Sequence, residues 1–308
     1  MPRGAARGAE RAGASPLVSV VIPTARGGTL LGEAVESALR QTVQDVEVLV
    51  VRNAPGVDVS CLAPDSRVRL VDEPIPGRAF AVNRGAFEAH GRWLALLDDD
   101  DAWAPEKLER QLQALDGWDG VAASVTNYVR VDEDGNVVKG GISRRADFDE
   151  LISYRTGYLP STLLVDRELF SVIGGMNSTY RSADDLDMFL RLATLGRIAF
   201  VDGPMLRYRV HAGSMNRTTP AVVWLEGARV ISDARRAAVL RGDWKTWRHS
   251  WRATILMRRW CASDAMAFAD QLRRERRFGP AARQVALALR ASPLDVVRLA
   301  LKRLAGRV

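Results

Sequence analysis

Short runs of β-branched and aliphatic residues alternate with stretches of helical periodicity along the first two thirds of the chain. Continuous apolar runs are typical of strands buried in a parallel sheet, and a period of 3.6 residues indicates helices that cover its faces. The runs predict strands at 17–22, 46–51, 68–71 and 93–97, and the periodic stretches predict helices at 30–40, 78–89 and 105–115. This alternation indicates a βαβ layer fold, so the core is predicted to be α/β, with a mostly parallel sheet.

Antiparallel strands are predicted after the parallel part. A run at 121–124 resumes the strand pattern, and the alternating stretch 129–138 contains an Asp-Gly pair, which is a hairpin signal. Further strands are expected near Ile198 and Leu206. Two helices, each ended by glycine, are predicted at 166–173 and 184–195.

Beyond about residue 219 the pattern is helical throughout. Trp244, Trp247 and Trp251 lie at i, i+3 and i+7 there, so they share one helix face. Packing into a core is the preferred interpretation of this face, and a membrane or sugar platform is the alternative. The chain is therefore expected to divide into a disordered tail at 1–15, an α/β domain at 16–218 and a helical region at 219–308.

Four consecutive aspartates, Asp98 to Asp101, close the apolar run at 93–97. Like charges this close repel, and ligands of open α/β sheets bind beyond the carboxyl ends of strands. Asp98 and Asp100 stand two residues apart, so an extended chain would point both carboxylates the same way, as ligands suited to Mg²⁺ or Mn²⁺. The alternative is an acidic turn that caps the helix beginning near Pro105.

Composition is typical of a compact cytoplasmic protein. With 308 residues, 47% of them hydrophobic, one or two domains are expected. The two cysteines, Cys61 and Cys261, are too few for a disulfide framework and indicate a reducing compartment. The stretch 2–15 lacks the apolar segment of a secretory signal, and no run approaches the roughly 18 apolar residues of a membrane span. The chain is expected to be soluble or peripheral.

The net charge of +7 is distributed unevenly. Residues 244–308 hold 15 Lys and Arg against 4 Asp and Glu, a surplus of +11, so the rest of the chain sums to −4. This asymmetry predicts an anionic partner, with phospholipid at the inner face of the membrane as the first candidate. No nucleic acid is expected, because no nucleic-acid-binding motif accompanies the charge. A solvated basic face on packed helices is the alternative.

The segments VSVVIPT, SALRQT, VEVLVV, NRG, LLDDDD and SADDLDMFLR follow one another in this chain. In this order and spacing, the chain resembles the family two glycosyltransferases of GT-A fold over residues 16–214. The resemblance implies a nucleotide-binding α/β half joined to an acceptor-binding half. It also implies an inverting transfer of sugar from a nucleotide donor, with Mn²⁺ or Mg²⁺ bridging the donor diphosphate.

The resemblance also assigns roles near the donor. Asp98 would lie near the ribose and Asp100 would bind the metal, with Asp99 and Asp101 supporting them. Arg84 could pair with phosphate or with an aspartate; a structural Arg-to-Asp pair is the alternative. The residues expected to bind the donor are Pro23, Thr24, Arg52, Asn53, Asn83, Arg84, Asp98 and Asp99, and those expected at the metal are Asp98, Asp100 and His211.

An inverting transfer needs a base for the acceptor hydroxyl, and a carboxylate is the usual choice. The family places it in an acidic pair that opens a helix, here Asp184 and Asp185, and Asp185 is the preferred base. The alternative is that both merely complement the helix dipole. Asp187 and Arg191, four residues apart, are expected to form a structural pair.

By the same resemblance, His211 could complete the metal site, or be a loop histidine without a ligand. Ser161 and Thr162 match the segment that lines the acceptor side, where their hydroxyls could bind sugar or cap a turn.

Two segments depart from the family pattern. After the second strand the chain reads Arg52-Asn53-Ala54-Pro55, where the family has an aspartate that reads the donor base. An Asp-to-Arg exchange reverses the charge, so uracil recognition is not carried over. The first loop carries Arg26 between Ala25 and Gly27, where the family has an aromatic residue and an asparagine. Arg26 and Arg52 could recognise a different base or phosphate, or mark a chain that has lost activity.

The leading hypothesis has three alternatives. The leading hypothesis is a metal-dependent inverting transferase that glycosylates a glycan or lipid-linked acceptor, and a tailoring transferase acting on a peptide or secondary metabolite is the closest alternative. A sugar nucleotidyltransferase would open with a glycine-rich basic loop, of which Arg26, Gly27 and Gly28 are a faint echo. A noncatalytic nucleotide-sugar or membrane-binding protein on the same fold is the third possibility.

Overall fold

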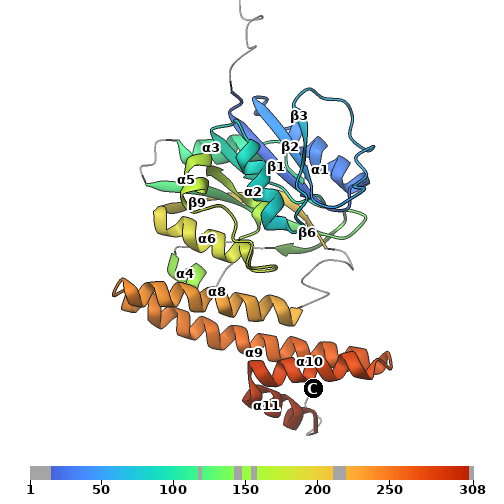
Figure 1. Cartoon of the computed structure of the whole chain (residues 1–308), viewed down its shortest axis with the longest axis vertical. Coiled ribbons are helices and arrows are strands. Elements are labelled where there is room, and N and C mark those ends of the chain that lie inside the picture. Colours follow the sequence, from blue (N-terminus) through green and yellow to red (C-terminus); the bar gives the residue numbers. More distant parts are fainter. Residues whose placement is uncertain (1–14, 117–119, 142–147, 154–157, 211–219, 305–308) are drawn as a thin grey trace, which may run out of the picture.

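The computed structural model describes residues 15–116, 120–141, 148–153, 158–210 and 220–304. Within these ranges, an α/β part contains a mixed sheet, and long helices from Pro220 onward lie below it in Figure 1. Residues 1–14 of the predicted tail lie outside the described residues.

The sheet has the strand order β3-β2-β1-β4-β8-β6-β9-β5, with β7 beside β6. Strands β1 to β4 are parallel to one another, β8 runs antiparallel between β4 and β6, and β9 runs parallel to β6. Their bounds are β1 Val18–Thr24, β2 Val46–Arg52, β3 Val68–Asp72, β4 Trp93–Leu96, β5 Ala102–Trp103, β6 Val121–Val131, β7 Val137–Gly141, β8 Leu164–Asp166 and β9 Arg197–Arg209. The predicted parallel core and the predicted hairpin, β6 with β7, are confirmed.

The two strands expected near Ile198 and Leu206 form the single strand β9. Its pairing with β6 jumps from Val201 to Pro204 while β6 advances by one residue, so the intervening residues bulge out. Gly203 has a φ of 99°, which a residue without a Cβ adopts at little cost. The apparent break in the pattern is therefore a β-bulge.

Helices cover both faces of the sheet. They are α1 Thr29–Leu39, α2 Arg78–Glu88, α3 Lys107–Leu115, α4 Phe148–Ile152, α5 Arg167–Val172 and α6 Asp184–Leu195. Alternate residues of β1 point to opposite faces, so Val20 packs with α1 and α3, whereas Val21 packs with α2 and α6. Because β1, β2 and β4 are parallel, their carboxyl ends share one edge of the sheet, where binding sites of such folds lie.

The C-terminal helices are α8 Pro220–Leu240, α9 Trp244–Arg274, α10 Phe278–Ala291 and α11 Pro293–Leu304. Helix α8 lies between α6 and α9 (Figure 1), and Ile231 and Met257 extend the core of the α/β part into this region. None of the helices within the described ranges is both long and apolar enough to span a bilayer.

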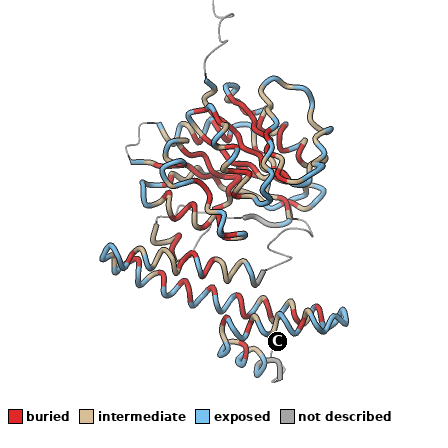
Figure 2. Tube along the Cα trace, in the orientation of Figure 1, coloured by how far each residue is buried: buried red, intermediate tan, exposed pale blue. Residues whose placement is uncertain are grey.

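The preferred interpretation of the tryptophan face was wrong. Trp244, Trp247 and Trp251 are 65%, 37% and 44% exposed, so they do not form a core. Helix α9 packs against α8 through smaller residues instead, including Ser250, Ala253 and Met257, and exposed positions follow its outer side (Figure 2). Periodicity identifies residues that share a face but does not show which face is buried.

We predict that Gly85→Ala lowers the free energy of unfolding by about 2 kcal/mol, the cost typical of overpacking. Gly85 lies where α2 meets the sheet, and an added Cβ would come within 3.0 Å of Val51 Cγ2 and closer still to Val21 Cγ1. Gly32→Ala in α1 is the matched control, because its Cβ would meet the Cys61 carbonyl oxygen at 3.4 Å. Urea denaturation should show the control unchanged or about 0.5 kcal/mol more stable; equal effects would contradict the close approach.

Candidate active site

A cavity of about 510 Å³ opens at the carboxyl ends of β1, β2 and β4. Its wall is formed by the loops that follow these strands, the first turns of α2 and α6, and the end of β9. Among the residues that line it are Pro23, Thr24, Arg26, Asn53, Arg78, Asp98, Asp99, Asp100 and Asp185. Most of the predicted donor site is therefore brought together at one edge of the sheet.

The four aspartates form a turn rather than the extended segment that the spacing argument assumed. The backbone N–H of Asp101 donates to the carbonyl of Asp98 at 3.2 Å. The turn still presents the carboxylates of Asp98 and Asp100 to the cavity, with side chains 26% and 18% exposed. Burial raises the pKa of Asp98 to about 6; the positive charge of Arg78 opposes this rise, and Asp100 adds to it.

The other two aspartates hold the turn in place. The carboxylate of Asp99 accepts hydrogen bonds from Thr24 Oγ1 at 2.6 Å and Arg26 Nη2 at 2.7 Å. The buried carboxylate of Asp101 accepts from Ser161 Oγ at 2.7 Å and from the backbone N–H of Arg209 at 3.0 Å. Asp101 therefore does not cap the next helix, α3, which begins only at Lys107 and has no side-chain cap. Burial raises the pKa of Asp101 well above its ordinary value, and Asp98 and Asp100 add to the rise, whereas the hydrogen bonds from Ser161 and Arg209 oppose it.

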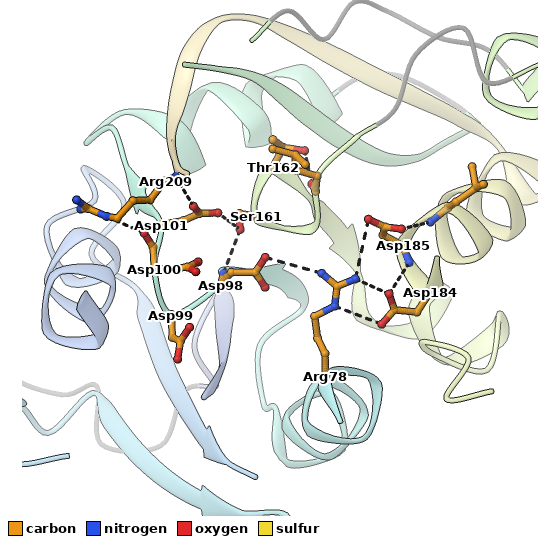
Figure 3. A network of polar contacts seen from close by, with 12 residues as sticks. Arg78, Asp98, Asp99, Asp100, Asp101, Ser161, Thr162, Asp184, Asp185 and Arg209 are labelled. Carbon is orange, nitrogen blue, oxygen red and sulfur yellow. Dashed lines mark hydrogen bonds and ion pairs between the residues drawn. The ribbon is translucent and has the colours of Figure 1, made fainter. Parts of the chain in front are cut away.

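Arg78, in the first turn of α2, links the aspartate turn to α6 (Figure 3). Its guanidinium binds Asp184 through two nitrogens, with Nε 3.2 Å from Oδ2. Its other contacts are to Asp98 and Asp185, each at 3.9 Å. The three carboxylates raise the pKa of Arg78 above its usual value, although burial opposes them. The sequence analysis missed Arg78, and its position after Pro76 and Gly77 at a helix start was the available signal.

The acidic pair of α6 divides into two roles. Asp184 is 1% exposed and engages Arg78, so it is a structural anchor rather than a residue open to substrate. Asp185 lines the cavity, and burial raises its pKa to about 6, with Arg78 opposing and Asp184 reinforcing the rise. A carboxylate with a raised pKa at a cavity wall has the properties of a general base. The predicted structural pair of Asp187 and Arg191 is confirmed at 2.8 Å.

Ser161 and Thr162 do not face the cavity. Both are fully buried in the short 3₁₀ helix η1 (Pro160–Thr162), and their hydroxyls donate to Asp101 and to the carbonyl of Leu159. The hydroxyl of Ser161 also accepts the backbone N–H of Asp98 at 3.0 Å. Ser161 therefore holds the aspartate turn from behind, and Thr162 closes the local turn of η1, whereas an acceptor-binding role would need hydroxyls that reach the cavity.

The NRG segment lies away from the aspartates. Arg84 pairs with Glu88 one helical turn on, at 2.8 Å, and its side chain is 44% exposed. The side-chain amide of Asn83 exchanges two hydrogen bonds of 2.8 Å with the backbone of Met176. The pairing of Arg84 with an aspartate is therefore corrected. Arg84 lies six residues along the helix from Arg78, which places it on another face about 9 Å further along the axis.

Arg52 and Arg26, the two arginines that depart from the family pattern, lie in different places. Arg52 pairs with Asp72 of β3 at 2.8 Å and is not among the residues that line the cavity, whereas the buried Asn53 is. Arg26 lines the cavity, with its side chain 54% exposed, and bridges Asp99 and Asp100 at 2.7 and 2.9 Å. Arg26 and Arg52 thus do not act on the cavity together.

His211 lies outside the described residues, so its predicted place at the metal is not tested. The neighbouring Arg209 is described and is 8% exposed. Its guanidinium donates to the Asp100 carbonyl at 3.1 Å and pairs with Glu33 at 2.7 Å. Arg209 therefore fixes the backbone of the aspartate turn to the end of β9.

The carboxylates at the cavity supply some of the oxygen ligands that a hard divalent cation needs. Within the described ranges, no group of three or more acidic, His or Cys side chains is arranged as a complete metal site. Asp98 and Asp100 nevertheless face one cavity, where burial raises the pKa of Asp98 although Arg78 opposes the rise. Mg²⁺ commonly uses one or two carboxylates together with substrate phosphates and water, so two protein ligands suffice.

Comparisons with known proteins agree with this geometry. The sequence profile described as glycosyl transferase family 2 matches residues 19–185, more than half of the chain. The glycosyltransferase GlyG of Streptococcus pneumoniae serotype 4 is 29% identical over 231 residues, covering 68% of this chain and 76% of GlyG.

Two solved structures share the fold. The mannosyltransferase PcManGT from Pyrobaculum calidifontis, in complex with GDP-Man and Mn²⁺, matches with a TM-score of 0.58 and 18% identity, over 94% of this chain and 81% of that chain. S. aureus TarS 1–349 in complex with UDP matches with a TM-score of 0.53 and 17% identity, over 69% of this chain and 63% of that chain. A longer TarS chain is covered over 39% of its length. The expected GT-A fold is confirmed.

We predict that Arg78→Met lowers the free energy of unfolding by about 2 kcal/mol, because it leaves the carboxylate of Asp184 buried without its charged partner. Arg84→Met on the same helix is the matched control, since its exposed pair with Glu88 should contribute less than about 0.5 kcal/mol. Chemical denaturation measures both. Similar losses for the two variants would show that Arg78 does not anchor α6.

Proposed function

This chain belongs to glycosyl transferase family 2, and from that premise we propose that it is a metal-dependent inverting transferase acting on a glycan or lipid-linked acceptor hydroxyl. The observation that carries this proposal is the placement of Asp185 and the Asp98–Asp100 pair in one cavity, on either side of Arg78 (Figure 3). A base for the acceptor and ligands for a metal-diphosphate group are thereby held a fixed distance apart.

The donor is proposed to lie over the aspartate turn. Its diphosphate would be near Asp98, Asp100 and Arg26, and the side chain of Asn53 is available to its nucleoside. Mn²⁺ or Mg²⁺ would be held by Asp98 and Asp100, and when bound it supplies positive charge that offsets the diphosphate leaving group. The complex of the Pyrobaculum calidifontis enzyme with GDP-Man and Mn²⁺ supports a nucleotide-sugar donor and a divalent metal.

The transfer requires a proton acceptor, and the acceptor hydroxyl must approach the anomeric carbon from the side opposite the leaving diphosphate. The acceptor oxygen forms a bond to the anomeric carbon as the bond from that carbon to the diphosphate oxygen breaks, and the hydroxyl proton passes to Asp185. The Asp185 carboxylate accepts the backbone N–H of Leu186 at 2.7 Å and lies 3.9 Å from Arg78, which is bound by the anchored Asp184. The roles of the acidic pair are therefore unequal: Asp185 acts on the substrate and Asp184 positions the machinery.

Recognition of the donor base is not expected to use Arg52, because that side chain pairs with Asp72. We predict that one of UDP, GDP, dTDP and CDP raises the thermal stability of the chain selectively, and only with Mn²⁺, because a ligand that binds the folded state stabilises it. At a hundred times its dissociation constant the gain would be about 2.7 kcal/mol. Differential scanning fluorimetry with and without EDTA measures it. No response to any nucleotide would contradict the donor site.

We predict that Asp185→Asn lowers kcat by about 100-fold to 10,000-fold, the range expected for loss of a general base, while stabilisation by the nucleotide is retained.

Because Asp185 must be deprotonated to act, wild-type kcat should fall as the pH drops through about 6, the value to which burial and Asp184 raise its pKa against Arg78. Release of nucleotide diphosphate measured across pH tests both. An unchanged kcat in the variant would remove Asp185 from the mechanism. Donor binding with no turnover even in the wild-type chain would favour a noncatalytic binding protein.

A further inference from the structure

The first half of helix α9 carries an unusual surface. Its exposed side chains are almost all aromatic, aliphatic or basic, and no acidic residue occurs between positions 244 and 263. We define the aromatic–basic face of α9 by Trp244, Trp247, Trp251, Ile255, Arg248 and Arg252, all of them exposed. A helix surface that is exposed to solvent normally mixes acidic and basic residues, so the composition of this face indicates a binding partner.

This face is uncovered only over part of the helix. Ala262 and Ala265 lie 18 residues, or five turns, after Trp244 and Trp247, and therefore point in the same direction. Both alanines are fully buried against α10 and α11. The chain thus covers the second half of the face with its own helices and leaves the first half open, at the position where small residues give way to tryptophans.

The start of the open part contacts the α/β part. On α4, the carboxylate of Asp149 contacts Lys245 and lies 3.3 Å from His249 Nδ1, so the start of α9 is tied to the α/β part. The rings of Trp244, Trp247 and Trp251 follow one another edge to face, with centroids 6.0 and 6.3 Å apart, and Arg235 of α8 lies over Trp251 at 4.1 Å. Each of these indoles therefore has an aromatic or cationic neighbour at the surface.

We propose that the aromatic–basic face of α9 docks on an anionic phospholipid surface. Indoles prefer the boundary between headgroups and acyl chains, and flanking arginines gain about 1 kcal/mol each beside anionic headgroups. A helix of this kind lies in the plane of the membrane interface. A second copy of the chain fits less well, because pairing two such faces would place arginines against arginines. Docking would bring a lipid-linked acceptor to the cavity, and this last step alone rests on the proposed function.

Flotation of the full chain with vesicles of phosphatidylcholine and phosphatidylglycerol, compared with pure phosphatidylcholine, tests the docking. The wild-type chain should float only with the anionic vesicles. The double variant Arg248→Gln and Arg252→Gln should bind them about 30-fold more weakly. The matched control changes Arg40 and Arg92, exposed on the α/β part, to Gln, and should bind like the wild-type chain.

The apolar part is tested by brominated lipids, which quench indoles that enter the membrane. Quenching should be strong in the wild-type chain and largely lost when Trp244, Trp247 and Trp251 are changed to Ala, with the melting curve of that variant confirming that it folds. Absence of flotation, or flotation unaffected by both sets of changes, overturns the proposal. Self-association abolished by the tryptophan changes would assign the face to a second copy instead. Asp185→Asn should float normally, so failure of docking and failure of catalysis are distinguishable.

Discussion

The arrangement of the site depends on one buried ionic contact, between Arg78 and Asp184. Helix α6 contributes the acidic pair and the β4 end contributes the aspartate turn, and Arg78 contacts both. Removing charges from water is costly, so such a contact persists where it fixes geometry rather than where it adds much stability. Here it fixes the distance across the cavity. Asp185 lines the cavity, while its neighbour Asp184 takes the structural role.

The same division of roles explains why four aspartates occur in a row. Asp98, Asp99 and Asp100 line the cavity, and Asp99 and Asp101 also accept hydrogen bonds from Thr24 and Ser161. Without the carboxylates of Asp99 and Asp101 the turn would lose its hydrogen bonds to Thr24 of β1 and to the backbone of Arg209 at the end of β9, which help to hold Asp98 and Asp100 side by side. Arg26 also contacts Asp99 and Asp100. Any metal that binds Asp100 must therefore share it with, or take it from, this guanidinium.

Much of this could be predicted from the sequence, for a physical reason. Buried parallel strands have continuous apolar runs, and parallel strands end at one edge, so residues such as Asp98 and Asn53 are placed together by the pattern alone. The sequence did not show which way each side chain points, or which residues far away in the chain it contacts. Arg78 and Arg84 both occur on α2, and only the packing shows that Arg78 faces Asp184 while Arg84 faces solvent. Ser161 was matched to the acceptor side, yet its hydroxyl points into the protein, toward Asp101.

Helix α9 also shows that the sequence does not reveal which side chains pack against a distant element. Three tryptophans with helical spacing favoured a core on grounds of hydrophobic area, because each large ring contributes most when buried. The core is instead built by small residues such as Ala253 and Ser250, which let α8 and α9 approach closely. Trp224 of α8 and Trp260 of α9 meet between the two helices, with centroids 5.0 Å apart, whereas the rings of Trp244, Trp247 and Trp251 lie outside among arginines. Hydrophobicity alone ranks the tryptophans first for burial, but the space between the helices determines which residues are buried.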